Sequence, residues 1–440
     1  MDNTYMGNEE MKEVMAGETT EETTEETTEE KVTYKDAFKQ KEYMKLLIAN
    51  SISRFGDSID AIAFTWITYA ITGSAMWSAL IYAMNTLPSV LLQPFSGALV
   101  EGLNKKKVMV VTDFIRGIVV LSLALLYMAD FLNPLVLVVF TLIISSVETL
   151  CMPAATAIIP NLIDMKCYSR CSSLSSVAST IMQLVGTAAA GVIIGTLGVG
   201  VAIALDALTF FLSGLILCFL KSKEDLQKLQ EQMLKGYVTT LKEGFTYLAD
   251  KPIIRNFIIL TIIVNGILVP INALQAPLVS EVWKQGPEML SVWSAAMVLS
   301  MGAASVVFPL LMDRMKVRTI LVMSGMMLGV GVLSFALAGL VSSCTWAVYT
   351  IAIGGAVLAS LGVVTASSVL SVQFMKLVNQ EYLARAASIM GAGAMASTPV
   401  ISLLVSGLTA VISTQMLVLL SGVLCVIIFI LVEILKVRVE

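Results

Sequence analysis

Three ionisable side chains lie close together within the first long apolar segment, in the sequence Ser-Ile-Ser-Arg-Phe-Gly-Asp-Ser-Ile-Asp. Arg54, Asp57 and Asp60 are three residues apart, and each step of three residues rotates a helical side chain by about 60° relative to the previous one. The three side chains therefore share one broad helix face. An ionisable group in hydrocarbon costs about 2.5 kcal/mol or more, so this face predicts a cavity or charged partners.

Four further ionisable residues lie in later apolar segments. Asp113 and Arg116 have the same spacing of three residues, which predicts an ion pair within one helix. Glu148 and Asp206 have no such neighbour, and for these two residues, as for Asp57 and Asp60, two roles are possible. A partly desolvated carboxyl group facing a cavity can load and release a proton or bind a cation; the alternative is an interhelical ion pair with Arg54 or Arg116. The four residues are Asp113, Arg116, Glu148 and Asp206.

The sequence lacks the motifs of enzymes and of ATP-driven pumps. It contains no histidine, and its six cysteines form no Cys-x-x-Cys pair, so we expect no metal site and no disulfide framework. There is no GxxxxGK followed by Ser or Thr, and no serine-centred elbow. We therefore expect neither enzymatic activity nor a cofactor, and ATP-driven transport would need another subunit.

The composition is that of a polytopic membrane protein. Hydrophobic residues make up 57% of the 440 residues and charged residues 14%, and the mean hydropathy is +0.85. A helix that crosses the hydrocarbon core needs roughly 20 apolar residues, and short polar breaks separate twelve such stretches. We expect an all-α membrane protein with twelve transmembrane helices. The expected spans are 46–71, 78–100, 108–129, 134–158, 172–196, 200–220, 254–279, 289–312, 319–341, 346–371, 383–407 and 414–436.

The distribution of basic residues predicts the orientation in the membrane, because short cytoplasmic loops concentrate Lys and Arg. Of the 28 basic residues, 25 lie near the two ends of the chain or in and beside alternate loops, and the opposite loops hold only Lys284. We therefore expect a multi-pass protein of the cell membrane with both termini in the cytoplasm.

The polar segments divide the chain into four parts. Residues 1–30 carry eleven acids and one base, which predicts a disordered acidic cytoplasmic tail. Residues 31–220 and 253–440 each hold six spans. Between them, residues 221–252 place apolar side chains at helical spacing among charged ones, which predicts an amphipathic linker on the inner membrane surface.

A polar hairpin follows the second expected span. The sequence Gly97-Ala-Leu-Val-Glu-Gly-Leu-Asn-Lys-Lys-Lys107 places an acid and three lysines between two membrane helices. A weaker version, from Pro309 to Arg318, recurs about 212 residues later when Asp313 is aligned with Glu101. The repetition predicts a duplicated six-helix unit. The candidate gating residues are Gly97, Glu101, Lys105, Lys106, Lys107, Asp113, Arg116, Asp313, Arg314 and Arg385.

The hairpin resembles the signature that the major facilitator superfamily carries between helices two and three: a glycine, an acid four residues later, and a basic cluster. The sequence departs from that signature in having Glu101 for Asp, Gly102 for Arg and Asn104 for Gly. A narrower resemblance, to the macrolide-efflux and enterobactin-exporter-like branch, spans nearly the whole chain after the acidic tail. Its motifs are Phe55-Gly-Asp57, Thr72-Gly-Ser-Ala75, Asp113-x-x-Arg116, Pro153 with Ile159-Pro160, Glu243-Gly244-Phe245-x-Tyr247 and Pro252.

The resemblance implies two pseudo-symmetric six-helix bundles that rock about a central site. It implies that Glu101 contacts the cytoplasmic start of helix eleven near Arg385, and that the three lysines anchor the hairpin and meet anionic lipid. The expected function is proton-coupled efflux of a hydrophobic or amphiphilic compound, such as a macrolide-like drug, by a monomer in the lipid bilayer. Asp57 is the expected proton carrier.

Other functions remain open. A transporter of a siderophore or a metabolite would need a more polar and more basic cavity. Because only Arg54 and Arg116 supply positive charge within the helices, a strongly anionic substrate is disfavoured. A non-transporting sensor or scaffold would act through the acidic tail, and a membrane enzyme is the least favoured class. We expect no nucleic-acid partner.

Overall fold

The structure, a computed structural model, describes residues 34–101, 103–221, 252–378 and 380–435. Twelve long α-helices lie within these ranges, and eleven of them are long and apolar enough to cross a membrane. The remaining one, α3, carries Arg54, Asp57 and Asp60 near its middle. The expected all-α fold with twelve long helices is confirmed. The helices are α3 (Lys41–Thr72), α4 (Ala75–Glu101), α5 (Lys105–Met128), α6 (Pro134–Ile158), α7 (Tyr168–Leu197), α8 (Val199–Cys218), α10 (Pro252–Ala273), α12 (Pro287–Arg314), α13 (Val317–Ala338), α14 (Thr345–Leu377), α15 (Gln380–Leu408) and α16 (Thr414–Ile434).

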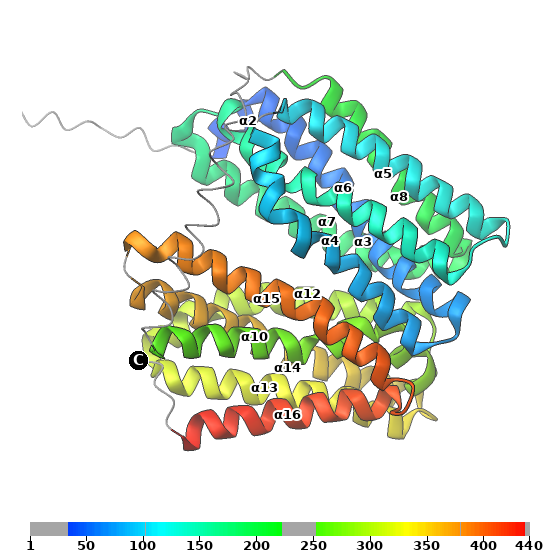
Figure 1. The fold of residues 1–440 in the computed structure, drawn as a ribbon, viewed down its shortest axis with the longest axis vertical. Helices are drawn as coiled ribbons and strands as arrows, with labels where there is room; N and C mark the ends of the chain where they lie inside the picture. Colours follow the sequence, from blue (N-terminus) through cyan, green and yellow to red (C-terminus); the bar gives the residue numbers. More distant parts are fainter. Residues whose placement is uncertain (1–33, 102, 222–251, 379, 436–440) are drawn as a thin grey trace, which may run out of the picture.

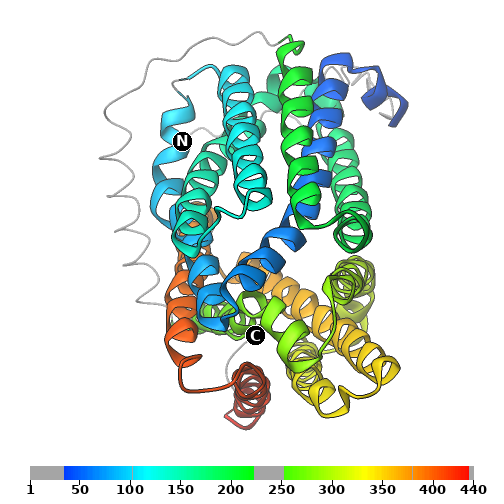
Figure 2. The same cartoon turned by 90° about the vertical axis from the view of Figure 1, so that its right-hand side faces the viewer.

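The helices form two bundles, as Figures 1 and 2 show. The first bundle contains α3 to α8, and the second contains α10 to α16. In the first bundle α3 packs against α7 and α8, and α5 packs against α6 and α8. In the second, α13 packs between α14 and α16, and α10 packs against α15. The predicted acidic tail and nearly all of the predicted linker lie outside the described residues.

Successive helices alternate in direction, so the connecting segments collect at two ends of the molecule. One end holds nearly all the basic residues of the described helix termini and loops, and we call it the basic end. Its residues include Lys105, Lys106, Lys107, Lys166, Lys221, Arg314, Lys316, Arg318 and Lys376. In the described connections at the opposite end, Lys284 is the one basic residue.

A polar contact joins the first and last helices of the first bundle at the basic end. The Lys45 ammonium donates to both carboxylate oxygens of Glu42, at 2.8 and 3.0 Å, and to the carbonyl oxygen of Phe219 at 3.0 Å. The backbone N–H of Lys221 donates to Glu42 at 2.7 Å. The hydrogen bonds from Lys45 and Lys221 lower the pKa of Glu42. This contact fixes the start of α3 beside the end of α8.

The two bundles are hydrogen-bonded to each other near the end opposite the basic one. The hydroxyl of Ser402 in α15 donates to the carbonyl oxygen of Ala79 in α4 at 2.9 Å, and Ser406 donates to the carbonyl oxygen of Met76 at 3.0 Å. In Figure 1 the ribbons of the bundles meet at this end and separate toward the basic end. The described structure is therefore closed at the end away from the basic residues.

The chain after α10 differs from the prediction. The expected span 254–279 is too long, because α10 ends at Ala273 and is followed by α11 (Gln275–Pro277) and a π-helix, η3 (Leu278–Val282). Pro277 has no N–H to donate to the carbonyl oxygen of Ala273, so the α-helix cannot continue regularly through this position. The break creates a short irregular segment between the bundles.

That irregular segment carries Glu281, which connects three elements. The hydroxyl of Tyr69 in α3 donates to one carboxylate oxygen of Glu281 at 2.9 Å. The hydroxyl of Thr414, at the start of α16, donates to the other oxygen at 3.1 Å. Glu281 thus adds a second contact between the bundles, on the same side as the α4 and α15 contact.

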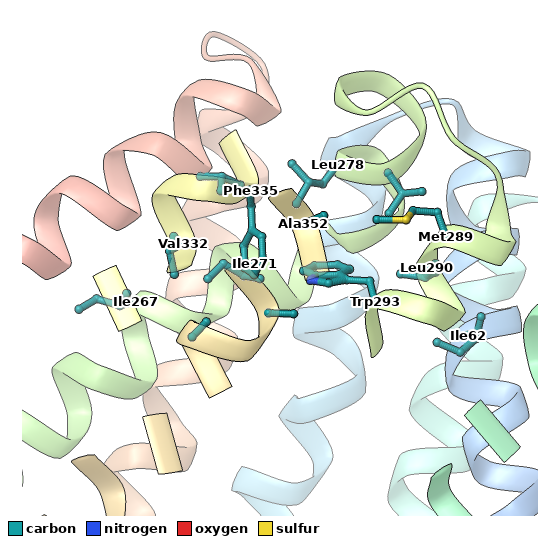
Figure 3. Close-up of a cluster of buried hydrophobic side chains, with 14 of the residues drawn as sticks. Ile62, Ile267, Ile271, Leu278, Met289, Leu290, Trp293, Val332, Phe335 and Ala352 are labelled. Atoms are coloured by element: carbon teal, nitrogen blue, oxygen red, sulfur yellow. The ribbon is translucent and has the colours of Figure 1, made fainter. Parts of the chain in front are cut away.

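The core of the second bundle is built around three aromatic rings. Trp293 packs edge-on against Trp283 and Phe335, with ring centroids 5.1 and 5.0 Å apart, and all three side chains are fully buried. The indole N–H of Trp283 donates to the carbonyl oxygen of Phe335 at 2.8 Å. Figure 3 shows Trp293 and Phe335 of this cluster together with Ile62 of α3, which belongs to the same continuous core. Apolar packing therefore extends from one bundle into the other.

Candidate functional site

The centre of the site is an ion pair between two helices. Asp57 in α3 accepts a hydrogen bond from the Arg116 guanidinium of α5 at 2.7 Å. Arg116 is only 7% exposed, and its guanidinium carbon lies 4.0 Å from the centroid of the Phe210 ring in α8. A buried guanidinium is stabilised by both contacts, by charge pairing and by the negative face of the ring. Arg116 therefore joins three helices of the first bundle.

The predicted pair between Asp113 and Arg116 within α5 is not formed. Asp113 is buried and accepts a hydrogen bond from the Ser213 hydroxyl of α8 at 2.6 Å. The spacing of three residues permits a pair within a helix, but the acid of the neighbouring helix α3 competes for the same cation. The two residues of α5 thus have partners on different helices.

Two further carboxyl groups lie beside this pair with few partners. Asp206 in α8 is 1% exposed, and the Thr209 hydroxyl donates to its carboxylate at 3.3 Å. One carboxylate oxygen of Asp60 is buried and has no hydrogen-bond partner in the part of the chain that the structure describes. Gly56 faces Asp206 and Thr209 so closely that a Cβ atom there would overlap both side chains. The glycine therefore permits the close approach of α3 and α8.

Glu148 in α6 faces a cavity that contains most of the predicted charged residues. The cavity has a volume of about 320 Å³. Both bundles contribute to its wall, since Asn272 and Ala273 of α10 complete it. Asp113 and Asp206 are not part of its lining, although Asp206 interacts electrostatically with Asp60 and Arg116. The predicted residues that line it are Arg54, Asp57, Asp60, Arg116 and Glu148.

Arg54 lies at the meeting point of several cavities. It donates to the side-chain oxygen of Gln183 in α7 at 2.9 Å. Besides the cavity that Glu148 faces, it lines a second cavity of about 370 Å³, whose wall includes Gln275 and Ser294 of the second bundle, and a third of about 440 Å³ along α7. The structure therefore brings four of the five predicted cavity residues, Arg54, Asp57, Asp60 and Glu148, to one cavity together with Arg116, and leaves Asp206 outside its lining.

Away from the helix ends, the charged residues of the membrane segments lie in the first bundle, which has five carboxyl groups and two guanidinium groups there. In the second bundle Arg255, Glu288 and Glu433 lie at the ends of membrane segments, and the sequence has no charged residue from 256 to 280, 289 to 312, 319 to 375 or 386 to 432. The wall that the second bundle adds is polar but uncharged, through residues such as Asn272 and Gln275. The charge-dependent chemistry of the site belongs to one half of the molecule.

Of the predicted gating residues, Asp113 and Arg116 belong to the charged cluster around the ion pair, and the others lie at or near the basic end. Asn104 caps α5 by accepting from the backbone N–H of Lys107 at 2.8 Å, and the Lys106 ammonium donates to the carbonyl oxygen of Cys218 at 2.8 Å. Gly97 lies in the last part of α4, and Lys105 and Arg314 lie at helix ends. The side chains of Glu101, Asp313 and Arg385 lie outside the described part of the structure. The contact between Glu101 and Arg385 stays a prediction.

Several residues of the site were not found from the sequence. Ser213 and Phe210 carry no local signal, because their role depends on which helices are neighbours. A signal did exist for α7, where hydroxyl side chains recur every three or four residues from Ser172 to Thr180. The helical period predicts that such residues share one face, and they do line the cavity along α7.

Known membrane proteins are similar to this chain in sequence. A family described as transmembrane secretion effectors matches residues 35–438. The multidrug efflux pump Tap of Mycolicibacterium fortuitum is 24% identical over 248 residues, which cover 54% of this chain and 60% of Tap. The chain thus spans about three fifths of the length of such curated relatives.

A second curated relative matches over a longer range. Macrolide efflux protein A of Streptococcus pyogenes is 23% identical over 373 residues, which cover 84% of this chain and 89% of that protein. Among solved structures, the nucleoside transporter NupG has the same fold, with a TM-score of 0.75 at 12% identity over 90% of this chain and 99% of NupG. The chain therefore belongs to the transmembrane secretion effector family, within the major facilitator superfamily of membrane transporters.

Proposed function

We propose that this protein is a proton-coupled exporter of hydrophobic or amphiphilic compounds, such as macrolide-like drugs, that works by alternating access. One observation carries the proposal: carboxyl groups gather around a single buried guanidinium beside a cavity that both bundles line. The names of the relatives Tap and macrolide efflux protein A support the direction and the substrate class.

The proposed orientation places the basic end in the cytoplasm, because cytoplasmic loops of membrane proteins concentrate Lys and Arg. Both described ends of the chain, at residues 34 and 435, lie at that end. The contacts of Glu281 with Tyr69 and of Ser402 with Ala79 would then face the outside. In this orientation the contacts between the bundles close the outward side.

The proposed coupling step is a change of partner at Arg116. A proton arriving at Asp57 would neutralise the carboxylate, and the charge-assisted hydrogen bond to Arg116 would become a weaker neutral one. Glu148 faces the same cavity, and its negative charge would then attract the released guanidinium. The proton state of Asp57 would thereby change which helix α5 is bound to.

Accumulation of a radiolabelled macrolide and of a cationic dye in cells tests the proposal. Cells that express the protein should accumulate less macrolide than cells without it, and an uncoupler of the proton gradient should abolish the difference. The Asp57→Asn variant should lose the effect. Asp130→Asn is the matched control, since Asp130 lies in a loop at the far end and its positive φ of 57° suits Asn.

Two results would contradict the proposal. If neither compound accumulates less in the expressing cells, drug efflux is not the function, although the fold assignment is unaffected. If Asp57→Asn exports like the wild type and remains sensitive to the uncoupler, the assignment of Asp57 as proton carrier is wrong.

A further inference from the structure

One face of α7 presents hydroxyl groups to the cavity of about 440 Å³. The residues on this face recur every three or four positions, which places them on one side of the helix. The Thr180 hydroxyl donates back to the carbonyl oxygen of Ser176. The hydroxyls of Ser172 and Ser179 form no hydrogen bond to another described residue, so they are available to a bound molecule. The face consists of Ser172, Ser175, Ser176, Ser179, Thr180 and Gln183.

Arg54 lies at the inner end of this face with an incompletely bonded guanidinium group. One terminal nitrogen donates to the neutral side chain of Gln183, whereas Nε is buried and has no hydrogen-bond partner within the described ranges. Asp57, Asp60 and Glu148 line the same cavity as Arg54, and Glu148 interacts electrostatically with it. None of the three forms an ion pair with Arg54 in the described structure, and Asp57 pairs with Arg116. Arg54 is therefore a cation with no carboxylate bonded to it among the described residues.

We propose that Arg54 binds a carboxylate group of the transported compound, and that the hydroxyl face of α7 binds polar groups of the same compound. A guanidinium group presents its donors in a planar fork that fits a carboxylate. Because Arg116 is already paired, one guanidinium is available, which matches a compound with one negative charge. A phosphate monoester carries about −1.5 to −2 charges at neutral pH, which is more negative charge than one guanidinium group can neutralise.

The rest of the compound is apolar in this proposal. The second cavity that Arg54 lines, of about 370 Å³, has Ala61, Ile62 and Val298 in its wall together with uncharged polar groups and Asp57, whose charge is paired with Arg116. A carboxylate at Arg54 can therefore have an apolar body beside it, between the bundles. The inferred substrate class is an amphiphilic organic acid. This inference rests on the proposed function, since it treats the cavities as a transport pathway.

Binding to the purified full-length protein in detergent tests the inference. The probes are 1-pyrenebutyrate and its uncharged methyl ester, titrated near neutral pH and followed by pyrene fluorescence. The wild type should bind the acid about tenfold more tightly than the ester, as expected for a charge-assisted hydrogen bond. Arg54→Gln should bind the two probes equally, with the affinity for the ester unchanged, and Arg54→Lys should keep part of the preference.

Lys284→Gln is the matched control, because it removes one positive charge at the opposite end of the molecule, and it should retain the full preference. Equal affinity of the wild type for both probes, binding of neither probe, or a preference that survives in Arg54→Gln would each overturn the inference. If Arg54→Gln does not fold, the preference for the acid over the ester in the wild type and in Arg54→Lys still tests the inference. The titration uses no proton gradient, so a failure of macrolide efflux would overturn the proposed function without changing this result.

Discussion

Arg116 is the residue on which the other charged groups of the site depend. Its guanidinium bonds Asp57, stacks on Phe210 and acts electrostatically on Glu148 and Asp206. A buried ion pair is a weak source of stability by itself, because desolvation offsets much of the attraction between the charges. Removal of one partner is different, since the other charge is left buried alone.

Arg116→Gln should therefore destabilise the protein strongly. Loss of one partner of a buried pair costs about 3–5 kcal/mol, and the lower end applies here because the Asp57 side chain is 28% exposed. Thermal unfolding in detergent measures the effect. The double variant Asp57→Asn with Arg116→Gln should recover part of the loss, because no unpaired charge remains. If the loss of stability in the double variant equals the sum of the losses in the two single variants, this account is contradicted.

At the scale of helices, the site depends on how closely α3 approaches α8. The side chains of Thr209 and Asp206 occupy the space where a Cβ atom of residue 56 would lie. Only a residue without a side chain lets the two helices pack at this distance. The position of Asp57 and Asp60 relative to α8 is set by this contact.

Gly56→Val should separate α3 from α8. Overpacking a close helix contact costs about 1–3 kcal/mol or more, and the shift should also weaken the Asp57 to Arg116 pair. The measurement is the thermal unfolding midpoint of the purified variant together with its macrolide efflux. Gly354→Val is the control, because no atom lies within 4 Å of a Cβ placed there. Similar losses in both variants would mean that the helix contact is not the cause.

Most of the fold could be predicted from the sequence, because apolar length and the positions of polar breaks determine where membrane helices lie. The charged candidates were also found, since an acid within an apolar segment is visible in any single helix. The partners of Asp113 and Arg116 were not, because they depend on the rotation of α5 against α3 and α8. The end of α10 was missed for a local reason: Pro277 interrupts a segment whose apolar composition continues.

At the scale of the whole molecule, the contacts between the bundles hold the described state. Glu281 accepts hydrogen bonds from Tyr69 and Thr414, and Ser402 and Ser406 bond α15 to α4. The serine contacts use backbone carbonyl oxygens as acceptors, so substitution of their partners cannot remove them. Substitution of Ser402 or Ser406 would remove its own contact, and substitution of Glu281 would remove the contact with Tyr69.

Glu281→Ala should shift the equilibrium toward states that are open at this end. The variant loses the hydrogen bond from Tyr69 that joins the two bundles, and because the site is exposed we expect a shift of about tenfold in population. Electron spin resonance between labels at Ser74→Cys and Ala410→Cys, in a protein without its native cysteines, measures the distance across this end. The reference is the same label pair in the protein that retains Glu281. An unchanged distance distribution would show that Glu281 does not hold the closure.

The restriction of intramembrane charge to the first bundle also has an electrical consequence. A membrane potential exerts force only on charge, and moving one elementary charge through 100 mV corresponds to about 2.3 kcal/mol. Within the hydrocarbon that force acts on the half of the protein that carries α3, α5, α6 and α8, while the uncharged interior of the other half does not respond to it. A change in voltage would thus pull on one bundle relative to the other, and would do so by an amount that depends on how many of the five carboxyl groups hold a proton.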